Sequence, residues 1–365
     1  MDWIRVIAFD LLILFHIGMF FVSWDWHIKN NETIEWMRWP MIFVNQWRIP
    51  ILFVVSGMGT RFALSQRSGK QYLKERSFRL LIPLLVGVLI IVAPQVYIER
   101  LTEGATYNSF IEFYPDFFKG LYPKGNFSWH HLWFLPYLFL MSLIATPLFL
   151  NLRKNENKIL NAIINYVKKQ PFSLFLFAIP LFITEFFLSA HFPITHDLIG
   201  DWYALVFYFI LFISGFILVS LGKSLWVALD KIKYHALFTG IIAFPLLLWM
   251  WYNLWRGYYI ESVFIPIVKV INVWSWILVL FAFSAKFLNN ESRIIKYRNQ
   301  AVYPFYVLHQ TITIILGYWL MNHPMHYMWK FTIMVMGTFG ITWFIYEFFI
   351  RRIIILRPLF GLKTR

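Results

Sequence analysis

Residues 4–23 read IRVIAFDLLILFHIGMFFVS, an apolar run of 20 residues interrupted by Arg5, Asp10 and His16. At about 1.5 Å per residue, a helix of this length crosses the ~30 Å hydrocarbon core of a bilayer. A cleaved signal peptide would need neither an acid nor a histidine in its apolar segment, and no small-residue cleavage site follows. We therefore expect the run to remain in the protein as a transmembrane helix.

The composition places the whole chain in the same class. Hydrophobic residues make up 59% of the 365 and charged residues 14%, roughly half of the share that a soluble domain carries. The net charge of +15 would suit a nucleic-acid partner. However, the basic residues lie in short loops between apolar runs, which is typical of membrane orientation, so we expect no nucleic acid. The chain has no cysteine, and we expect no metal.

Nine further apolar runs of similar length follow the first. The predicted spans are Ile4–Ser23, Met41–Gly59, Leu80–Ile98, His131–Leu150, Phe172–Ala190, Trp202–Leu221, His235–Tyr252, Val263–Phe283, Tyr303–Leu320 and Trp329–Ile350. The fold class that they predict is an all-α polytopic membrane protein. We expect a single bundle of about ten transmembrane helices, forming one domain over residues 1–365.

Charge alternates between successive loops. Residues 61–79 and 153–169 are strongly basic, whereas residues 99–116 are mixed or acidic. Positively charged loops stay in the cytoplasm, so this alternation predicts that both termini are cytoplasmic. The expected location is the bacterial cytoplasmic (inner) membrane, with the lipid bilayer as a partner.

An ionisable residue inside a span costs about 2.5–3.5 kcal/mol on insertion scales, so each one is a candidate for function. Arg5 and His16 are eleven residues apart, within roughly 20° of whole helical turns, and therefore share a helix face about 16 Å apart along the axis. His16 is the candidate catalytic base, because imidazole takes a proton from an alcohol near neutral pH. Asp10, on another face, is the second catalytic candidate. A histidine that only bonds neighbouring helices is the alternative for His16.

Arg76 and Arg79 precede the third span and share a helix face at a spacing of three residues. Two guanidinium groups on one face form a plausible clamp for a diphosphate. Ordinary orienting charge at the cytoplasmic end explains the same residues equally simply. We assign Arg76 and Arg79, together with Arg5, as candidates for cofactor binding.

The remaining intramembrane polar residues are weaker candidates. The candidates for contact with the acceptor or an oxyanion are Asn45, Arg48, His131, His309 and Glu347. Each of them also suits a structural pairing or packing role. The run Phe53-Val-Val-Ser-Gly57 brings small residues to a helix end, where they permit close approach of a ligand or of another helix.

These landmarks together resemble the membrane acyltransferase 3 family. Arg5 with His16, Phe53–Gly57, Arg76-x-x-Arg79, His131-Leu-Trp-Phe-Leu135 and Pro304–His309 are similar to family motifs in the same order. Trp26-His27, after the first span, is similar to the branch that succinylates glucans, and these two residues are further acceptor-site candidates.

The resemblance implies an O-acyltransferase that moves a succinyl or acetyl group from cytosolic acyl-CoA to a hydroxyl of a periplasmic or extracellular carbohydrate such as a glucan. It implies that His16 is the base and that Arg5, Arg76 and Arg79 hold the CoA phosphates. A direct attack of the acceptor and an acyl-enzyme route are both open. The alternative function is a saccharide or acyl-carrier transporter (flippase) that uses the intramembrane charges as a proton relay.

Overall fold

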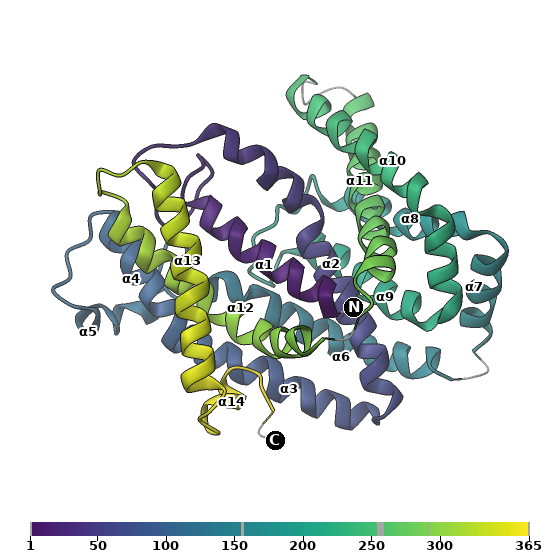
Figure 1. Cartoon of the computed structure of the whole chain (residues 1–365), viewed down its shortest axis with the longest axis horizontal. Helices are drawn as coiled ribbons and strands as arrows, with labels where there is room; N and C mark the ends of the chain where they lie inside the picture. Colours follow the sequence, from purple (N-terminus) through teal and green to yellow (C-terminus); the bar gives the residue numbers. More distant parts are fainter. Residues whose placement is uncertain (1, 155–156, 254–258, 291, 364–365) are drawn as a thin grey trace. The chain divides into compact units, whose positions relative to one another are not determined.

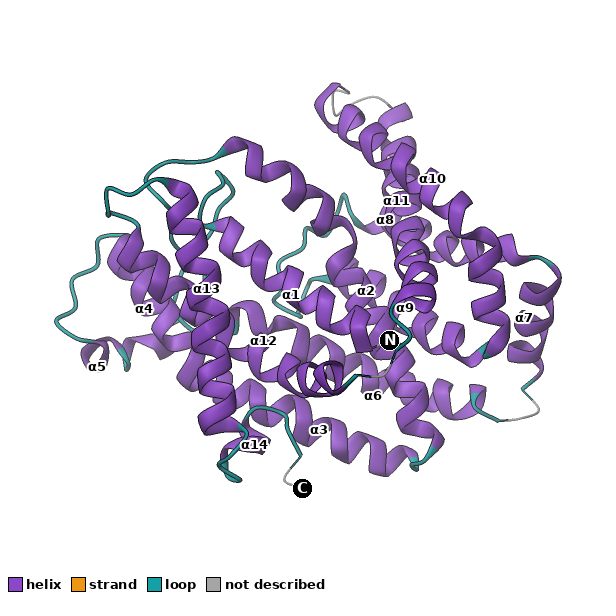
Figure 2. Cartoon of the chain, viewed as in Figure 1, coloured by secondary structure: helices purple, strands orange, loops and turns teal. Residues whose placement is uncertain are grey.

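The computed structural model describes residues 2–154, 157–253, 259–290 and 292–363 (Figure 1). Every regular element in these ranges is helical, and the β-structure there consists of one isolated bridge between Leu121 and Phe127 (Figure 2). The prediction of an all-α protein is therefore confirmed.

The helices of the first half alternate long elements with short turns. They are α1 (Asp2–Met19), η1 (Glu35–Met37), α2 (Arg38–Ser65), α3 (Gly69–Val86), η2 (Gly87–Val92), α4 (Ala93–Thr102), α5 (Phe110–Phe113), η3 (Asp116–Phe118), η4 (His130–Trp133) and α6 (Phe134–Leu152). The element η2 is π-helical and joins α3 to α4, so that residues 69–102 form one long helical segment.

The second half contains the longest helices. They are α7 (Lys158–Lys169), η5 (Pro171–Phe177), α8 (Ala178–Leu188), α9 (Trp202–Ser220), α10 (Lys223–Asn253), α11 (Tyr259–Phe287), α12 (Arg293–Leu320), α13 (Tyr327–Ile345), η6 (Tyr346–Ile350) and α14 (Leu356–Leu359). Helix α7 lies in the basic segment that we expected to be a loop, and Asn157 caps its first turn by accepting from the Leu160 amide.

Eight helical segments of the described chain are long and apolar enough to cross a membrane, and they coincide with eight of the ten predicted spans. The remaining two predicted spans fall on α1 and α12. Both are helical, and both carry polar residues within the helix, such as Asp10 and His16 in α1 and His309 in α12. A multi-pass membrane protein is thus confirmed, while the count of ten stays a prediction.

The chain divides into two compact units. The first contains Met1–Ala8, Asn45–Lys74 and Leu140–Ile295, and the second contains Phe9–Val44, Glu75–Phe139 and Lys296–Arg365. The single domain over residues 1–365 therefore stays a prediction.

Within the first unit, α2 and α9 pack backbone to backbone. A Cβ added at Gly57 would overlap the Phe212 carbonyl oxygen, and one added at Gly215 would overlap the Val54 carbonyl oxygen. Only glycine allows such close approach of two helices. Of the two occupants that the sequence allowed at Gly57, the structure contains a neighbouring helix.

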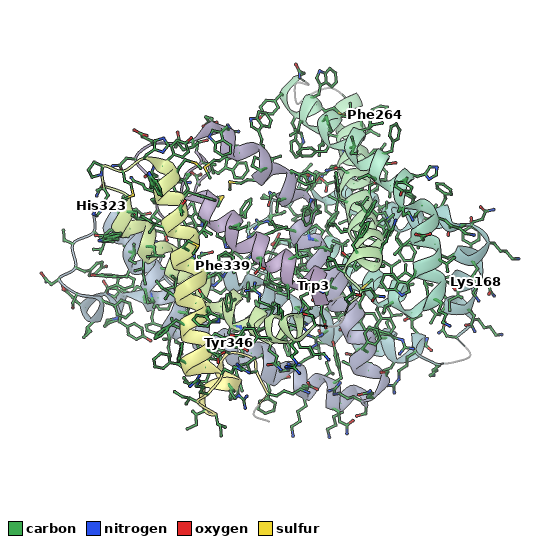
Figure 3. The ribbon with its side chains drawn as sticks, viewed as in Figure 1. Trp3, Lys168, Phe264, His323, Phe339 and Tyr346 are labelled. Carbon is green, nitrogen blue, oxygen red and sulfur yellow. The ribbon has the colours of Figure 1, made fainter. Side chains whose placement is uncertain are left out.

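Within the second unit, aromatic side chains join α12 to the last long helix. The Phe305 ring lies 6.5 Å from that of Phe339 and 6.2 Å from that of Tyr346. Figure 3 labels Phe339 and Tyr346 along this last helix. This packing holds α12 in place, and α12 carries several residues of the site described next.

Candidate functional site

His16 of α1 and His309 of α12 form a hydrogen-bonded pair in the second unit. Nδ1 of His16 lies 2.8 Å from Nε2 of His309, and the ring planes differ by 3°. Face-to-face rings could not bring two nitrogens so close, so the contact is an in-plane hydrogen bond between ring edges. The sequence identified both residues, and the structure brings them together.

Backbone carbonyls fix the proton positions in this pair. His309 Nδ1 is 2.8 Å from the Tyr306 oxygen and 3.1 Å from the Phe305 oxygen, and a carbonyl only accepts. Nδ1 of His309 must therefore carry a proton. In the neutral ring Nε2 then holds a lone pair, which accepts the Nδ1 proton of His16. The lone pair of neutral His16 is consequently on Nε2.

His131 of η4 packs against the same pair. It is buried, and its Nε2 donates to the Val307 oxygen at 3.1 Å. Its ring lies edge-on to His309, with centroids 5.1 Å apart at 85°. The Tyr306 hydroxyl donates to the His131 carbonyl at 2.6 Å. His131 is therefore held in place against the ring of His309.

Asp10 forms an ion pair with Arg298 of α12. The side chains are 32% and 27% exposed, respectively. Along with His16–His309, this pair gives a second connection between α1 and α12, and residue numbers rise together in both helices. The helices are therefore parallel, and Asp10 has a structural partner that the sequence did not predict.

A chain of side-chain amides extends from Gln310, inside α12, toward the loop after α1. Gln310 bonds His27 Nε2 at 3.1 Å and Gln95 Oε1 at 3.1 Å, and Gln95 bonds the Thr311 hydroxyl at 2.7 Å. Nδ1 of His27 bonds Glu99 at 2.9 Å. Trp26 lies beside this network, 5.6 Å from the His27 ring.

Tyr122, from the loop after η3, closes this network. Its hydroxyl donates to Glu99 Oε1 at 2.9 Å. Burial, followed by the Glu99 charge, raises the pKa of the Tyr122 hydroxyl well above its ordinary value. The phenol therefore stays protonated and remains a donor to the carboxylate.

Arg76 and Arg79 both belong to α3 in the second unit, and both interact electrostatically with the Tyr303 hydroxyl. Arg79 is also 3.3 Å from Glu75 and donates to the Gly361 oxygen at 3.4 Å. The two guanidinium groups therefore both act on Tyr303, and their proposed role at a diphosphate stays a prediction.

Arg48 is buried in the first unit, and its Nη2 donates to Asn45 Oδ1 at 3.1 Å. Arg5 also belongs to the first unit. It lies on α1, the same continuous helix as His16. The proposed roles of Asn45, Arg48 and Arg5 stay predictions.

Glu347 has a different set of partners. It accepts from Tyr297 at 2.9 Å and pairs with Arg351 at 2.8 Å and with Arg352 at 3.8 Å. These contacts correspond to the structural pairing that the sequence allowed for Glu347.

Three functional-site neighbours escaped the sequence reasoning. Arg298 and His130 lie outside the predicted spans, and Glu99 begins the segment 99–116 that we expected to be a loop. A signal existed for the amide network, because Gln310 and Thr311 directly follow His309 in an apolar helix. Nothing in the sequence connects Glu99 to His130 or to His27.

Comparisons with known proteins agree with these landmarks. The Acyl_transf_3 family, described as an acyltransferase domain, matches residues 1–347. The chain is 26% identical to the glucans biosynthesis protein C of Escherichia coli strain K12, over 96% of this chain and 91% of that protein. The same values hold for the glucans biosynthesis protein C of Shigella dysenteriae serotype 1 (strain Sd197). No solved structure matches significantly.

Proposed function

The chain belongs to the Acyl_transf_3 family of acyltransferases, and we propose that it transfers an acyl group from acyl-CoA to a hydroxyl group of a carbohydrate. The printed name of its relatives, glucans biosynthesis protein C, supports a glucan as the acceptor. Succinyl and acetyl are the acyl groups to be tested.

The hydrogen bond between His16 and His309 carries this proposal. Nε2 of His16 takes the proton of the acceptor hydroxyl while that oxygen attacks the thioester carbonyl carbon. The carbon–sulfur bond then breaks, and the CoA thiolate leaves with the proton that His16 holds. His309 keeps His16 in the productive tautomer, as the third residue of a hydrolytic triad does for its histidine.

Arginines bind the anionic donor, acyl-CoA. Arg76 and Arg79 bind the CoA phosphates together with Arg5, and Asn45 or Arg48 donates to the tetrahedral oxyanion. Asp10 acts through Arg298 by keeping α1 and α12 in register. In this proposal ten helices cross the bacterial inner membrane with both termini in the cytoplasm, where acyl-CoA is available.

The test is acyl transfer in proteoliposomes, with succinyl-CoA or acetyl-CoA and mixed glucans. Wild type should label the glucan, and His16→Ala should lose this activity while keeping its fold and CoA binding. His323→Ala is the matched control, because His323 is exposed in the turn between α12 and α13 (Figure 3). Full activity of His16→Ala would reject His16 as the base, and no CoA turnover by wild type would favour transport.

A further inference from the structure

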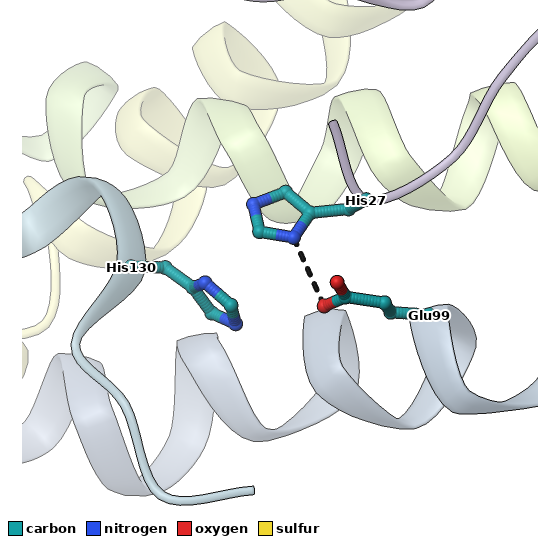
Figure 4. Close-up of side chains that lie close together, drawn as sticks. All are labelled: His27, Glu99 and His130. Carbon is teal, nitrogen blue, oxygen red and sulfur yellow. Dashed lines mark hydrogen bonds and ion pairs between the residues drawn. The ribbon is translucent and has the colours of Figure 1, made fainter. Parts of the chain in front are cut away.

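Three side chains from distant parts of the sequence meet at the far end of the amide network. They are His27 from the loop after α1, Glu99 from α4 and His130 from η4 (Figure 4). One potential ligand atom from each lies within 4.8 Å of the other two. Two imidazoles and one carboxylate are the donor set of many protein zinc sites that keep an open position.

His130 packs its ring edge-on against the rings of His27 and Tyr122, with centroid distances of 4.3 Å and 4.9 Å. Its Nε2 is buried and has no hydrogen-bond partner. Figure 4 shows the ring directed toward Glu99 and His27. Its backbone has φ 38°, a left-handed value that a non-glycine residue rarely adopts, and its amide donates to Ser128 Oγ at 2.9 Å. A buried, unsatisfied nitrogen held by a strained backbone indicates a missing partner.

The other two ligands already have the outer contacts that metal ligands need. Tyr122 donates to Glu99 Oε1, which leaves Oε2 facing His27, and Gln310 lies 3.1 Å from His27 Nε2. When Nδ1 binds a metal, the Gln310 amide can turn its oxygen to accept from Nε2, and the Gln95 amide must then turn too, so that its nitrogen replaces Oε1 opposite Gln310. Such contacts orient ligands and strengthen metal binding.

The nearby charges permit a divalent cation. Arg100 is a basic neighbour, with its guanidinium 5.8 Å from the Tyr122 ring centroid. It is held by Glu103 at 2.6 Å and by Asn126 at 2.8 Å, so a second carboxylate offsets its charge.

We propose that His27 Nδ1, Glu99 Oε2 and His130 Nε2 bind a divalent transition metal of the zinc class, with one coordination position left open. Binding replaces the proton that His27 now shares with Glu99 and gives the buried His130 nitrogen a partner. This site differs from the expectation of no metal, and it does not depend on the acyl-transfer proposal.

The experiment uses full-length protein purified in detergent, stripped with chelator and then incubated with Zn²⁺ or Co²⁺. We expect close to one equivalent of zinc by mass spectrometry and visible Co²⁺ absorption bands of a low-coordinate site. His130→Ala should abolish both signals, and Tyr122→Phe should weaken Co²⁺ affinity by about 10- to 100-fold.

Two variants keep the test decisive. Glu99→Gln preserves the shape and the Tyr122 contact while removing the carboxylate, so it reports on the site even if His130→Ala does not fold. His323→Ala removes an exposed histidine and should bind as wild type does. Absence of uptake by wild type, or equal uptake by wild type, His130→Ala and Glu99→Gln, would overturn the proposal.

Discussion

His16 and His309 are 293 residues apart in the chain, yet their ring nitrogens are joined by a 2.8 Å in-plane hydrogen bond. Because the Tyr306 carbonyl fixes the His309 proton on Nδ1, this bond determines which nitrogen of His16 is basic.

His309→Ala should therefore lower kcat by about 10²- to 10⁴-fold, nearly as much as His16→Ala. His309→Gln, whose side-chain oxygen can accept from His16 Nδ1, should recover part of the rate. The double variant should be no worse than the poorer single one, because the two residues act as a unit. If the losses in kcat of the two single variants multiplied in the double variant, measured in proteoliposomes, the two histidines would act independently and this prediction would be wrong.

Asp10→Asn should destabilise the protein more than it slows the reaction. It leaves Arg298 without its counter-charge, and because both side chains are about one-third exposed, we expect a loss of about 1–3 kcal/mol of unfolding free energy. Combining it with Arg298→Gln should cost less than the sum of the single changes. Thermal unfolding in detergent measures this effect. If Asp10→Asn had unchanged stability and no activity, Asp10 would be a catalytic residue instead.

Arg76→Ala and Arg79→Ala should each raise KM for acyl-CoA about 10-fold and leave kcat nearly unchanged, because each removes a charge-assisted contact to the bound donor. Raising the salt concentration should raise the wild-type KM in the same direction. Lys74→Ala is the control, since Lys74 is an exposed cation on the same helix. Equal effects from all three substitutions would indicate only general attraction to a basic surface.

Gly57 and Gly59 offer a matched pair on one helix. Gly57→Ala places a methyl group into the α9 backbone and should lower the unfolding temperature strongly, whereas an added Cβ at Gly59 meets no atom within 4 Å. Gly59→Ala should be neutral or stabilising by up to about 1 kcal/mol, because alanine favours the helix. Similar unfolding temperatures for both variants would argue against the close contact of α2 and α9.

His196 should make stability depend on pH. Burial lowers the pKa of its imidazole to about 4, although Asp201 acts in the opposite direction. As pH falls below 6.5, the unfolded chain binds a proton that the folded one does not, so stability should fall between pH 6.5 and 4, by at most about 2 kcal/mol at pH 5.

His196→Asn is the variant that tests this, because asparagine tolerates the local φ of 62° and does not titrate. The slope of unfolding temperature against pH from 7 to 5 should become flatter in it. An unchanged slope would assign the pH dependence to other groups.

The sequence predicted the helical class and eight of the membrane spans because apolar length is a local property. It also identified His16 and His309, since polar residues in apolar helices are conspicuous. Their pairing was out of reach, because no spacing rule connects residues on separate helices. Arg298 gave no separate signal, because it is one of several basic residues between the eighth and ninth predicted spans.

The cluster of His27, Glu99 and His130 was less predictable still. His130 sits in a short 3-10 turn, and its placement depends on a left-handed backbone that histidine rarely adopts. Glu99 lies at the end of a long helical segment, where an acid is expected to be solvated. Only the tertiary structure gives these residues a common location.

The parallel pairing of α1 with α12 also sets an order for biosynthesis. Helix α1 leaves the ribosome almost 300 residues before the segment that supplies Arg298 and His309, so the His16–His309 pair cannot form until most of the protein has been made. A nascent or prematurely terminated chain that ends before Arg293 would reach the membrane with His16 but with no means of fixing its tautomer. Under the proposed function, such fragments would therefore be unable to consume acyl-CoA.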